Sequence, residues 1–230
     1  GVFALAGSDF QTLLKPATSP VAAFRIGDPI ATAREVVGQL RQLEHVDAVV
    51  LIGHEQLEDD IALAKAVPGI DVIFGTHSHR KLDLEKIEGT STWIISPFQY
   101  LTYVSRVQLS FNCHDTKCAL GKVSGGLVPM DSKVPEDSET RTKVVRMQKE
   151  LELDPKYADL FRPIGSIDSE LSTDGQFESD AVLGNFATDV MRAAAGTDVA
   201  LATSSSFREP IPPGVVTEER LRAALPYPNK

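Results

Sequence analysis

The sequence predicts an α/β fold divided into two parts, and three features of the chain lead to this. Apolar, β-branched runs at 46–53 and 68–75 flank a helical segment at 57–67, and a strand–helix–strand unit of this length makes its strands parallel. A charged helical stretch, expected to be mostly solvated, follows at 136–153. Beyond it a second α/β pattern starts, with a helix of about 15 residues within 180–196 that ends at a glycine.

The other elements of the first part follow from local patterns. Residues 2–7 form a candidate short buried strand, and residues 31–45 carry apolar side chains at helical spacing, which predicts an amphipathic helix. The continuous apolar run at 46–53 is typical of a strand covered on both faces. After residue 90, apolar and polar residues alternate as they do in the strands of a meander.

In the second part, the helix within 180–196 is expected to pack Leu183, Phe186 and Val190 inward. The apolar run at 198–203 predicts a buried strand, because it is short, continuous and bounded by polar residues. A serine-rich loop follows directly after this run. The second part is therefore expected to combine helices and strands in an α/β arrangement, as the first part does.

Length and composition are those of an ordinary globular protein. The chain has 230 residues, of which 42% are hydrophobic and 24% charged, and its net charge is −9. This acidic balance speaks against nucleic-acid binding through a basic face, and no apolar run reaches the ~20 residues that span a bilayer. Because the chain lacks an initiator methionine and opens in a strand-like run, we expect the protein to extend beyond both ends of it.

Cys113 and Cys118 are the two cysteines of the chain, and they allow three interpretations. They are unrelated thiols, a local disulfide that closes a hairpin in an exported protein, or, with His114, part of a metal site. The metal site is the weakest of the three, because no second pair of ligands lies nearby in the sequence.

Three histidines follow the ends of predicted strands. His54 comes after the run at 46–53, and His77 and His79 come after the run at 68–75. The carboxyl ends of neighbouring parallel strands meet at one edge of a sheet, where ligand sites form, and residues two apart in extended backbone point the same way. We therefore expect the three imidazoles to converge on one crevice and to bind a metal, a single zinc ion being one possibility. The competing interpretation is a set of solvent-facing side chains.

Two longer stretches resemble a known family. The segment "VVLIGHEQLEDDIALAKAVPGIDVIFGTHSH" resembles the second half of a calcineurin-like metallophosphoesterase domain, in particular that of 5′-nucleotidases, where "PGIDVI" precedes "G-G-H-S-H". Downstream, "DAVLGNFATDVMRAAAGTDVALATSSSFREPIPPGVVTEERLRAALPYPN" resembles the C-terminal substrate domain of the same family. The order and spacing of the two patterns match over almost the whole chain.

The resemblance implies a domain organisation. Residues 1–131 would be the C-terminal part of a metallophosphoesterase β-sandwich flanked by helices, whose N-terminal part is missing. Residues 132–163 would form a linker helix region, and residues 164–230 the start of a second α/β, substrate-binding domain.

The resemblance also implies an active site. His54, His77 and His79 match metal ligands of a centre with two divalent ions (Zn, Mn, Co or Mg), which clamp a phosphate and activate a water molecule. The implied activity is hydrolysis of phosphate monoesters, above all nucleoside 5′-monophosphates or related nucleotides, as part of nucleotide catabolism. Members of the family are often exported, which implies an extracellular or cell-surface protein.

The substrate would be a small phosphate ester or nucleotide rather than a nucleic acid. Arg208 matches the arginine of the family's C-terminal pattern that contacts the substrate, and Ser206 and Phe207 precede it in the same loop. Judged without the resemblance, Arg208 would be assigned to a surface salt bridge.

The chain also departs from the family pattern. The early motifs D-x-H, G-D and G-N-H-(D/E), which supply the remaining ligands and the catalytic histidine, do not occur, so the sequence offers no catalytic residue and residues 1–230 alone are expected to be inactive. Where the family has N-G-G-G-I-R, this chain has "TSSSFR" at 203–208. The alternative function is therefore a non-catalytic binding or surface protein that keeps the fold.

Overall fold

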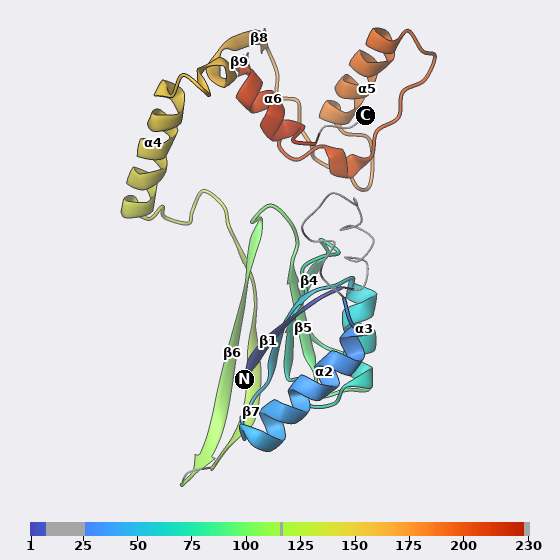
Figure 1. The fold of residues 1–230 in the computed structure, drawn as a ribbon, viewed down its shortest axis with the longest axis vertical. Coiled ribbons are helices and arrows are strands. Elements are labelled where there is room, and N and C mark those ends of the chain that lie inside the picture. Colours follow the sequence, from blue (N-terminus) through green and yellow to red (C-terminus); the bar gives the residue numbers. More distant parts are fainter. Residues whose placement is uncertain (8–25, 116, 228–230) are drawn as a thin grey trace. The chain divides into compact units, whose positions relative to one another are not determined.

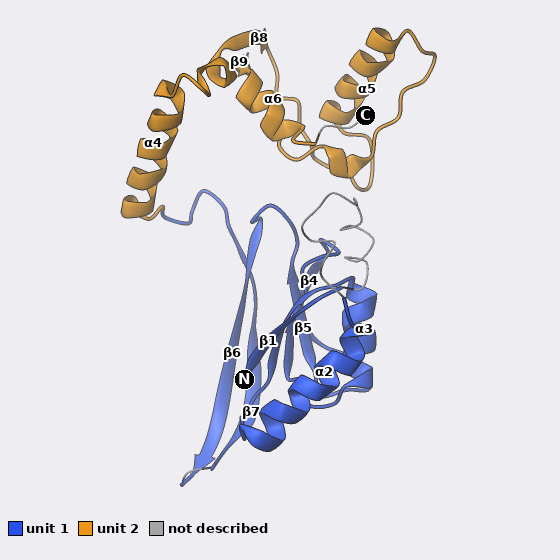
Figure 2. Cartoon of the chain, in the orientation of Figure 1, with its two compact units in different colours: residues 1–135 blue, residues 136–230 orange. Residues whose placement is uncertain are grey.

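The computed structural model describes residues 1–7, 26–115 and 117–227, which form two compact units. Unit 1 comprises residues 1–135 and unit 2 comprises residues 136–230, as Figure 2 shows in two colours. No helix in the described part of the chain is both long and apolar enough to cross a membrane.

Unit 1 is built on one mixed sheet (Figure 1). The strand order in this sheet is β1-β2-β3-β5-β4. The first four strands in this order pair in parallel, and the last pairs antiparallel to its neighbour. The strands are β1 (Val2–Ala6), β2 (Val50–His54), β3 (Val72–Phe74), β5 (Trp93–Pro97) and β4 (Lys81–Lys86). The predicted parallel pairing of the two strands that carry the histidines is confirmed.

Two helices pack on one face of this sheet. Helix α2 (Pro29–Gly38) begins after Asp28, whose side chain accepts a hydrogen bond from the Ala31 amide, and it continues as the π-helix η2 (Gln39–Leu43). Helix α3 (Leu57–Ala66) connects β2 to β3. Buried side chains of both helices meet those of the sheet in one apolar core: Ala33, Val37, Val49, Leu51, Leu63, Ala64, Val67, Ile70, Ile73, Ile87 and Ile94.

In β1 and β2 the face away from α2 and α3 is largely open among the described residues, which corrects the prediction that the run at 46–53 is covered on both faces. In β2, Leu51 is fully buried while the next residue, Ile52, is 51% exposed. Strand β1 alternates in the same way, and Val2 is exposed. Successive side chains point to opposite faces of a strand, so in β2 only the face under α2 and α3 is covered. Strand β3 differs, because Val72 and Ile73 are both fully buried and both of its faces are covered. A continuous apolar run could not reveal this.

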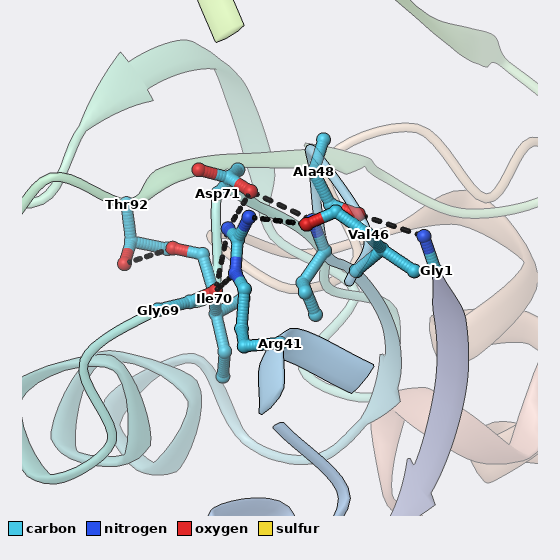
Figure 3. Close-up of polar contacts among 9 residues, drawn as sticks. Gly1, Arg41, Val46, Ala48, Gly69, Ile70, Asp71 and Thr92 are labelled. Atoms are coloured by element: carbon cyan, nitrogen blue, oxygen red, sulfur yellow. Dashed lines mark hydrogen bonds and ion pairs between the residues drawn. The ribbon is translucent and has the colours of Figure 1, made fainter. Parts of the chain in front are cut away.

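A polar cluster ties the amino ends of β2 and β3 together (Figure 3). The Arg41 guanidinium, carried by η2, donates to the Gly69 carbonyl at 3.0 Å and the Val46 carbonyl at 3.1 Å, and it pairs with the Asp71 carboxylate. Asp71 in turn accepts from the Val49 amide at 2.7 Å. The cluster lies at the sheet edge opposite the histidines, so it fixes the strands without entering the candidate site.

A long antiparallel hairpin completes unit 1. Strands β6 (Tyr103–His114) and β7 (Lys117–Pro129) pair along their whole length, and the Cys113–Cys118 disulfide links them near the turn. Of the three interpretations of the cysteines, the structure therefore has the disulfide. The meander prediction is wrong in part, because β5 joins the main sheet and pairs in parallel with β3. Strand β4, which the sequence does not predict, precedes β5 and pairs with its other edge.

Unit 2 begins with helix α4 (Ser138–Leu153), which has no buried residue, as its charge pattern predicts. After the 3₁₀ turn η3 (Ala158–Phe161), strand β8 (Pro163–Ile167) pairs antiparallel with β9 (Gly214–Thr217). Helix α5 (Val182–Ala195), the 3₁₀ turn η4 (Ser204–Ser206) and helix α6 (Glu218–Ala224) complete the unit. Its small core consists of Leu171, Leu183, Ala187, Phe207, Ile211, Val216 and Ala224.

Two predictions for unit 2 are wrong. Helix α5 ends at Gly196 as expected, but it buries Leu183 and Ala187, while Phe186 and Val190 are about half exposed. The run at 198–203 forms no strand and no described residue pairs with it as one, so its apolar side chains are exposed. An apolar run becomes a buried strand only where a neighbouring strand accepts its backbone hydrogen bonds.

Candidate functional site

His54 and His77 meet at the carboxyl edge of the sheet in unit 1. His54 is the last residue of β2, and His77 lies in the turn that follows β3. The Nε2 atom of His54 and the Nδ1 atom of His77 are 3.0 Å apart, and the ring centroids are separated by 4.7 Å. Neighbouring parallel strands thus bring these two imidazoles together, as their positions in the sequence predict.

Thr76 fixes the orientation of the His54 ring. Its hydroxyl donates to the Gly53 carbonyl at 2.9 Å, and its oxygen lies 2.8 Å from His54 Nδ1. Since the single hydroxyl proton is used on Gly53, the oxygen accepts from Nδ1–H, and a neutral His54 carries its lone pair on Nε2. That lone pair faces His77 Nδ1, which is the arrangement of a histidine prepared for metal coordination.

His79 does not join this pair. Its Nδ1 atom lies 3.2 Å from Gln99 Oε1, and its backbone has a φ of +49°. The prediction that His77 and His79 point the same way assumed extended backbone, but residues 77–78 form a turn. No group of three histidine, cysteine, aspartate or glutamate side chains within the described ranges is placed to hold a metal ion.

The imidazole pair fits two ligand positions of one metal ion. Two nitrogens bound to a tetrahedral zinc ion at ~2.0–2.1 Å lie about 3.3 Å apart. The 3.0 Å between His54 Nε2 and His77 Nδ1 is close to this spacing, so a small opening of the pair, with loss of the shared proton, would suffice. His79 would have to leave Gln99 to become a third ligand. The ligand role of all three histidines stays a prediction.

A buried carboxyl group belongs to the same sheet edge. Asp60, in the first turn of α3, is 1% exposed, and neither of its oxygens has a hydrogen-bond partner among the described residues. Its removal from water, and then the neighbouring carboxylates of Glu55 and Asp59, raise the pKa of Asp60 to about 7. A buried acid without a partner is costly and needs an explanation beyond packing.

Sequence reasoning missed both Thr76 and Asp60. Asp60 lies three and four residues before Leu63 and Ala64, so it shares the apolar face of its helix. An acid on such a face is the signal that could have identified it. Thr76 gives no comparable signal, because its role depends on the register between β2 and β3.

The predicted substrate residues belong to unit 2. The Arg208 guanidinium lies over the Tyr227 ring, 5.0 Å from its centroid, and its Nη2 atom donates to the Tyr227 hydroxyl at 3.0 Å. Its Nε atom is buried and has no partner in the described part of the chain. No ion pair among the described residues holds Arg208 there either, so the structure does not give it the surface salt bridge that was the competing interpretation.

The serine loop closes on itself. The Thr203 and Ser206 hydroxyl oxygens are 2.9 Å apart, and the Ser205 hydroxyl lies 3.4 Å from Thr203 Oγ1. Phe207 is 4% exposed and its side chain belongs to the apolar core, while its carbonyl accepts from Gln176 Nε2 at 3.2 Å. Phe207 therefore has a packing role in this structure, whereas Ser206 and Arg208 keep partial exposure.

Comparison with known proteins agrees with the sequence resemblance. Residues 163–230 match the family model described as the 5′-nucleotidase, C-terminal domain. The "Trifunctional nucleotide phosphoesterase protein YfkN" of Bacillus subtilis is 29% identical over 240 residues, which cover 99% of this chain and 16% of that protein. The chain thus spans only a small part of this relative.

Solved structures show the same fold. The 5′-nucleotidase precursor from Thermus thermophilus superposes with a TM-score of 0.66 at 23% identity, over 87% of this chain and 42% of that one. The sulfate thiohydrolase SoxB from the same organism gives a TM-score of 0.65 at 19% identity, over 99% of this chain and 40% of that one. These likenesses confirm the predicted α/β fold class, and they show that the fold occurs in proteins with different substrates.

Proposed function

Since the chain belongs to the 5′-nucleotidase family, we propose that the intact protein is a metal-dependent hydrolase of phosphate monoesters, with nucleoside 5′-monophosphates or related nucleotides as substrates. In this proposal residues 1–131 are part of the metallophosphoesterase domain, residues 132–163 are the linker and residues 164–230 begin the substrate domain. The physiological role would be nucleotide catabolism.

The single observation that carries the proposal is the imidazole pair of His54 and His77. Two histidines from adjacent parallel strands face each other through ring nitrogens, and one of them is oriented by a hydroxyl group on its other nitrogen. Imidazoles held in this way are the ordinary nitrogen ligands of zinc and other divalent ions.

In this proposal the residues at the sheet edge of unit 1 would bind the metal. His54 and His77 would hold a divalent ion, with His79 as a further ligand once released from Gln99, and Thr76 would keep the His54 ring in place. When bound, divalent ions polarise a phosphoryl oxygen and lower the pKa of a water molecule, which makes hydrolysis possible near neutral pH. The identity and number of the ions remain part of the proposal.

The substrate would be held by unit 2. Arg208 is restrained on Tyr227 and has a buried Nε atom without a partner among the described residues, so its guanidinium can receive a phosphate or other anionic oxygen. Ser206 stands two residues before Arg208, and its hydroxyl group, which is paired with Thr203 in this structure, would have to turn toward the substrate. The arginine would supply most of the attraction, because a charged donor makes the stronger hydrogen bond to an anion.

The experiment that tests the proposal measures metal content and turnover on the full-length protein with a panel of phosphate esters. The His77→Ala variant is expected to lose bound metal and turnover together, while His114→Ala, which removes an exposed histidine near the hairpin turn, keeps both. If the His77 variant retains its metal and its activity, the ligand role of His77 is wrong.

The second candidate function is binding without turnover. The hydroxyl groups of the serine loop are engaged with one another, an arrangement that does not require a substrate. A full-length protein that binds nucleotides but hydrolyses none of the esters, even when loaded with metal, would favour this alternative. Residues 1–230 alone are expected to show no turnover, since the described residues bring only two candidate ligands together.

We also propose that the protein works outside the cytosol, at the cell surface or beyond it. The Cys113–Cys118 disulfide supports this, because structural disulfides persist in oxidising compartments. Thiol labelling of the protein isolated from its natural source, with and without prior reduction, provides the measurement. Two freely reactive thiols before reduction would contradict the proposed location.

A further inference from the structure

The buried carboxyl group of Asp60 is positioned against both strand ends that carry the candidate site. An ideal Cβ atom built on Gly53 would lie 2.7 Å from Asp60 Oδ1, and one built on Gly75 would lie 2.7 Å from Asp60 Oδ2. One oxygen therefore occupies the side-chain space of each glycine. Neither glycine has a positive φ, so both are required here for space rather than for backbone conformation.

The two glycines are directly connected to the site. Gly53 precedes His54 and its carbonyl accepts the Thr76 hydroxyl, while Gly75 precedes Thr76. The carboxyl group and the Thr76 hydroxyl thus act on the same two backbone segments. A shift of either segment would change the 3.0 Å distance between His54 Nε2 and His77 Nδ1.

Stability alone does not explain an acid at this place. Asp60 has no hydrogen-bond partner among the described residues and lies beside other carboxylates, so an apolar residue would be cheaper to bury. What distinguishes the aspartate is its shape, because a planar carboxyl group has two oxygens and can contact two glycines at once. Asp60 lies in the first turn of α3, so these two glycine contacts also link the start of this helix to the strand ends.

We propose that Asp60 is a positioning residue of the candidate metal site, whose carboxyl group sets the distance between the backbone segments carrying His54 and His77. The assignment rests on the proposed function in so far as the pair is a metal site. The geometric claim about the two imidazoles does not depend on a bound ion.

The test compares substitutions at two neighbouring positions of α3 in the full chain. Asp60→Ala empties the space behind the glycines, Asp60→Asn preserves its shape without the charge, and Asp59→Ala removes an exposed carboxylate from the same turn as a control. Two properties are measured: the imidazole ¹⁵N chemical shifts of the metal-free protein, and the affinity for Co²⁺ followed by its absorption spectrum.

We expect Asp60→Ala to abolish the ¹⁵N signature of the hydrogen-bonded His54–His77 pair and to weaken Co²⁺ binding by about 10-fold or more, as is typical when support for metal ligands is lost. Asp60→Asn should keep the ¹⁵N signature of the pair and a Co²⁺ affinity within about threefold of that of the unchanged chain, because asparagine has the same side-chain shape as aspartate. Asp59→Ala should leave both unchanged. Unaltered imidazole shifts and Co²⁺ affinity in Asp60→Ala would overturn the assignment.

A size-exchange variant keeps the test decisive if Asp60→Ala does not fold. Adding Gly75→Ala to Asp60→Ala returns a methyl group to the vacated space, so the double variant should recover part of the pair's ¹⁵N signature, while Gly75→Ala alone should disturb it. Strict additivity of the two substitutions would refute the contact. If the unchanged chain shows the imidazole pair but binds no Co²⁺, the proposed function fails while the positioning role remains measurable through the shifts.

Discussion

Replacing Asp60 with asparagine should make the protein more stable at alkaline pH and change the pH dependence of its unfolding. Burial, followed by the carboxylates of Glu55 and Asp59, raises the pKa of Asp60 from 3.8 to about 7. A carboxyl group whose folded-state pKa is raised contributes stability that is present below its ordinary pKa. This stability is lost as the pH rises through about 7, since the ionised form is disfavoured in the folded state.

The size of the effect follows from this displacement. The difference between 3.8 and about 7 corresponds to ~4 kcal/mol of unfolding free energy, of which ~3 kcal/mol falls between pH 5 and pH 8. Asparagine has no proton to release and retains the shape of the side chain. The stability gained by Asp60→Asn over the unchanged chain should therefore grow by about 3 kcal/mol from pH 5 to pH 8.

The assay is urea unfolding at several pH values in the presence of a chelator. Trp93 is the only tryptophan and lies in β5, so its fluorescence reports on unit 1 alone. Asp59→Asn is the matched control, because it removes one of the carboxylates that act on Asp60 but is itself exposed. If the curves of Asp60→Asn and the unchanged chain run parallel from pH 5 to pH 8, the burial argument for Asp60 is refuted.

Three further predictions concern other contacts within unit 1. Thr76→Val should weaken metal binding by about 10-fold, because His54 loses the acceptor that orients its ring, and Thr76→Ser should restore it, as Co²⁺ titration can show. Arg41→Met should lower the unfolding free energy of unit 1 by ~2 kcal/mol, measured by urea unfolding, since two carbonyls and a carboxylate lose their cation; an unchanged midpoint would contradict this. Replacing Cys113 and Cys118 by serine should cost ~2 kcal/mol in the same assay, the value for a short closed loop, and no loss would mean that the hairpin is held by its strands alone.

The parts of the fold that could be predicted are those with a local period. The β2–α3–β3 unit follows from two apolar runs around a helical segment, and α4 follows from a charged pattern without a core face. Strand β4 alternates charged and apolar residues, but it is short and follows the histidine turn directly, so its local pattern does not predict a strand. Which face of a strand is covered depends on where the helices pack, and no local pattern contains that information.

For the candidate site, prediction succeeded where it depended on topology and failed where it depended on a single backbone angle. His54 and His77 meet because parallel neighbours end at the same edge. His79 turns toward Gln99 because the chain leaves the extended conformation after β3. Thr76 lies between these cases, because its position was predictable from the strand but its hydrogen bonds required the register.

Asp60 connects the stability of unit 1 to the candidate site, and the two experiments on it separate charge from shape. The unfolding assay detects the charge, because only an ionisable group loses stability as the pH rises. The imidazole shifts detect the shape, because both glycine contacts are made by the outline of the side chain. An asparagine variant that is more stable at pH 8 and still holds the imidazole pair would mean that the charge of Asp60 lowers stability without helping to position the pair. An asparagine variant that loses the pair would mean that the charge itself orders the site, and the shape argument would then fail.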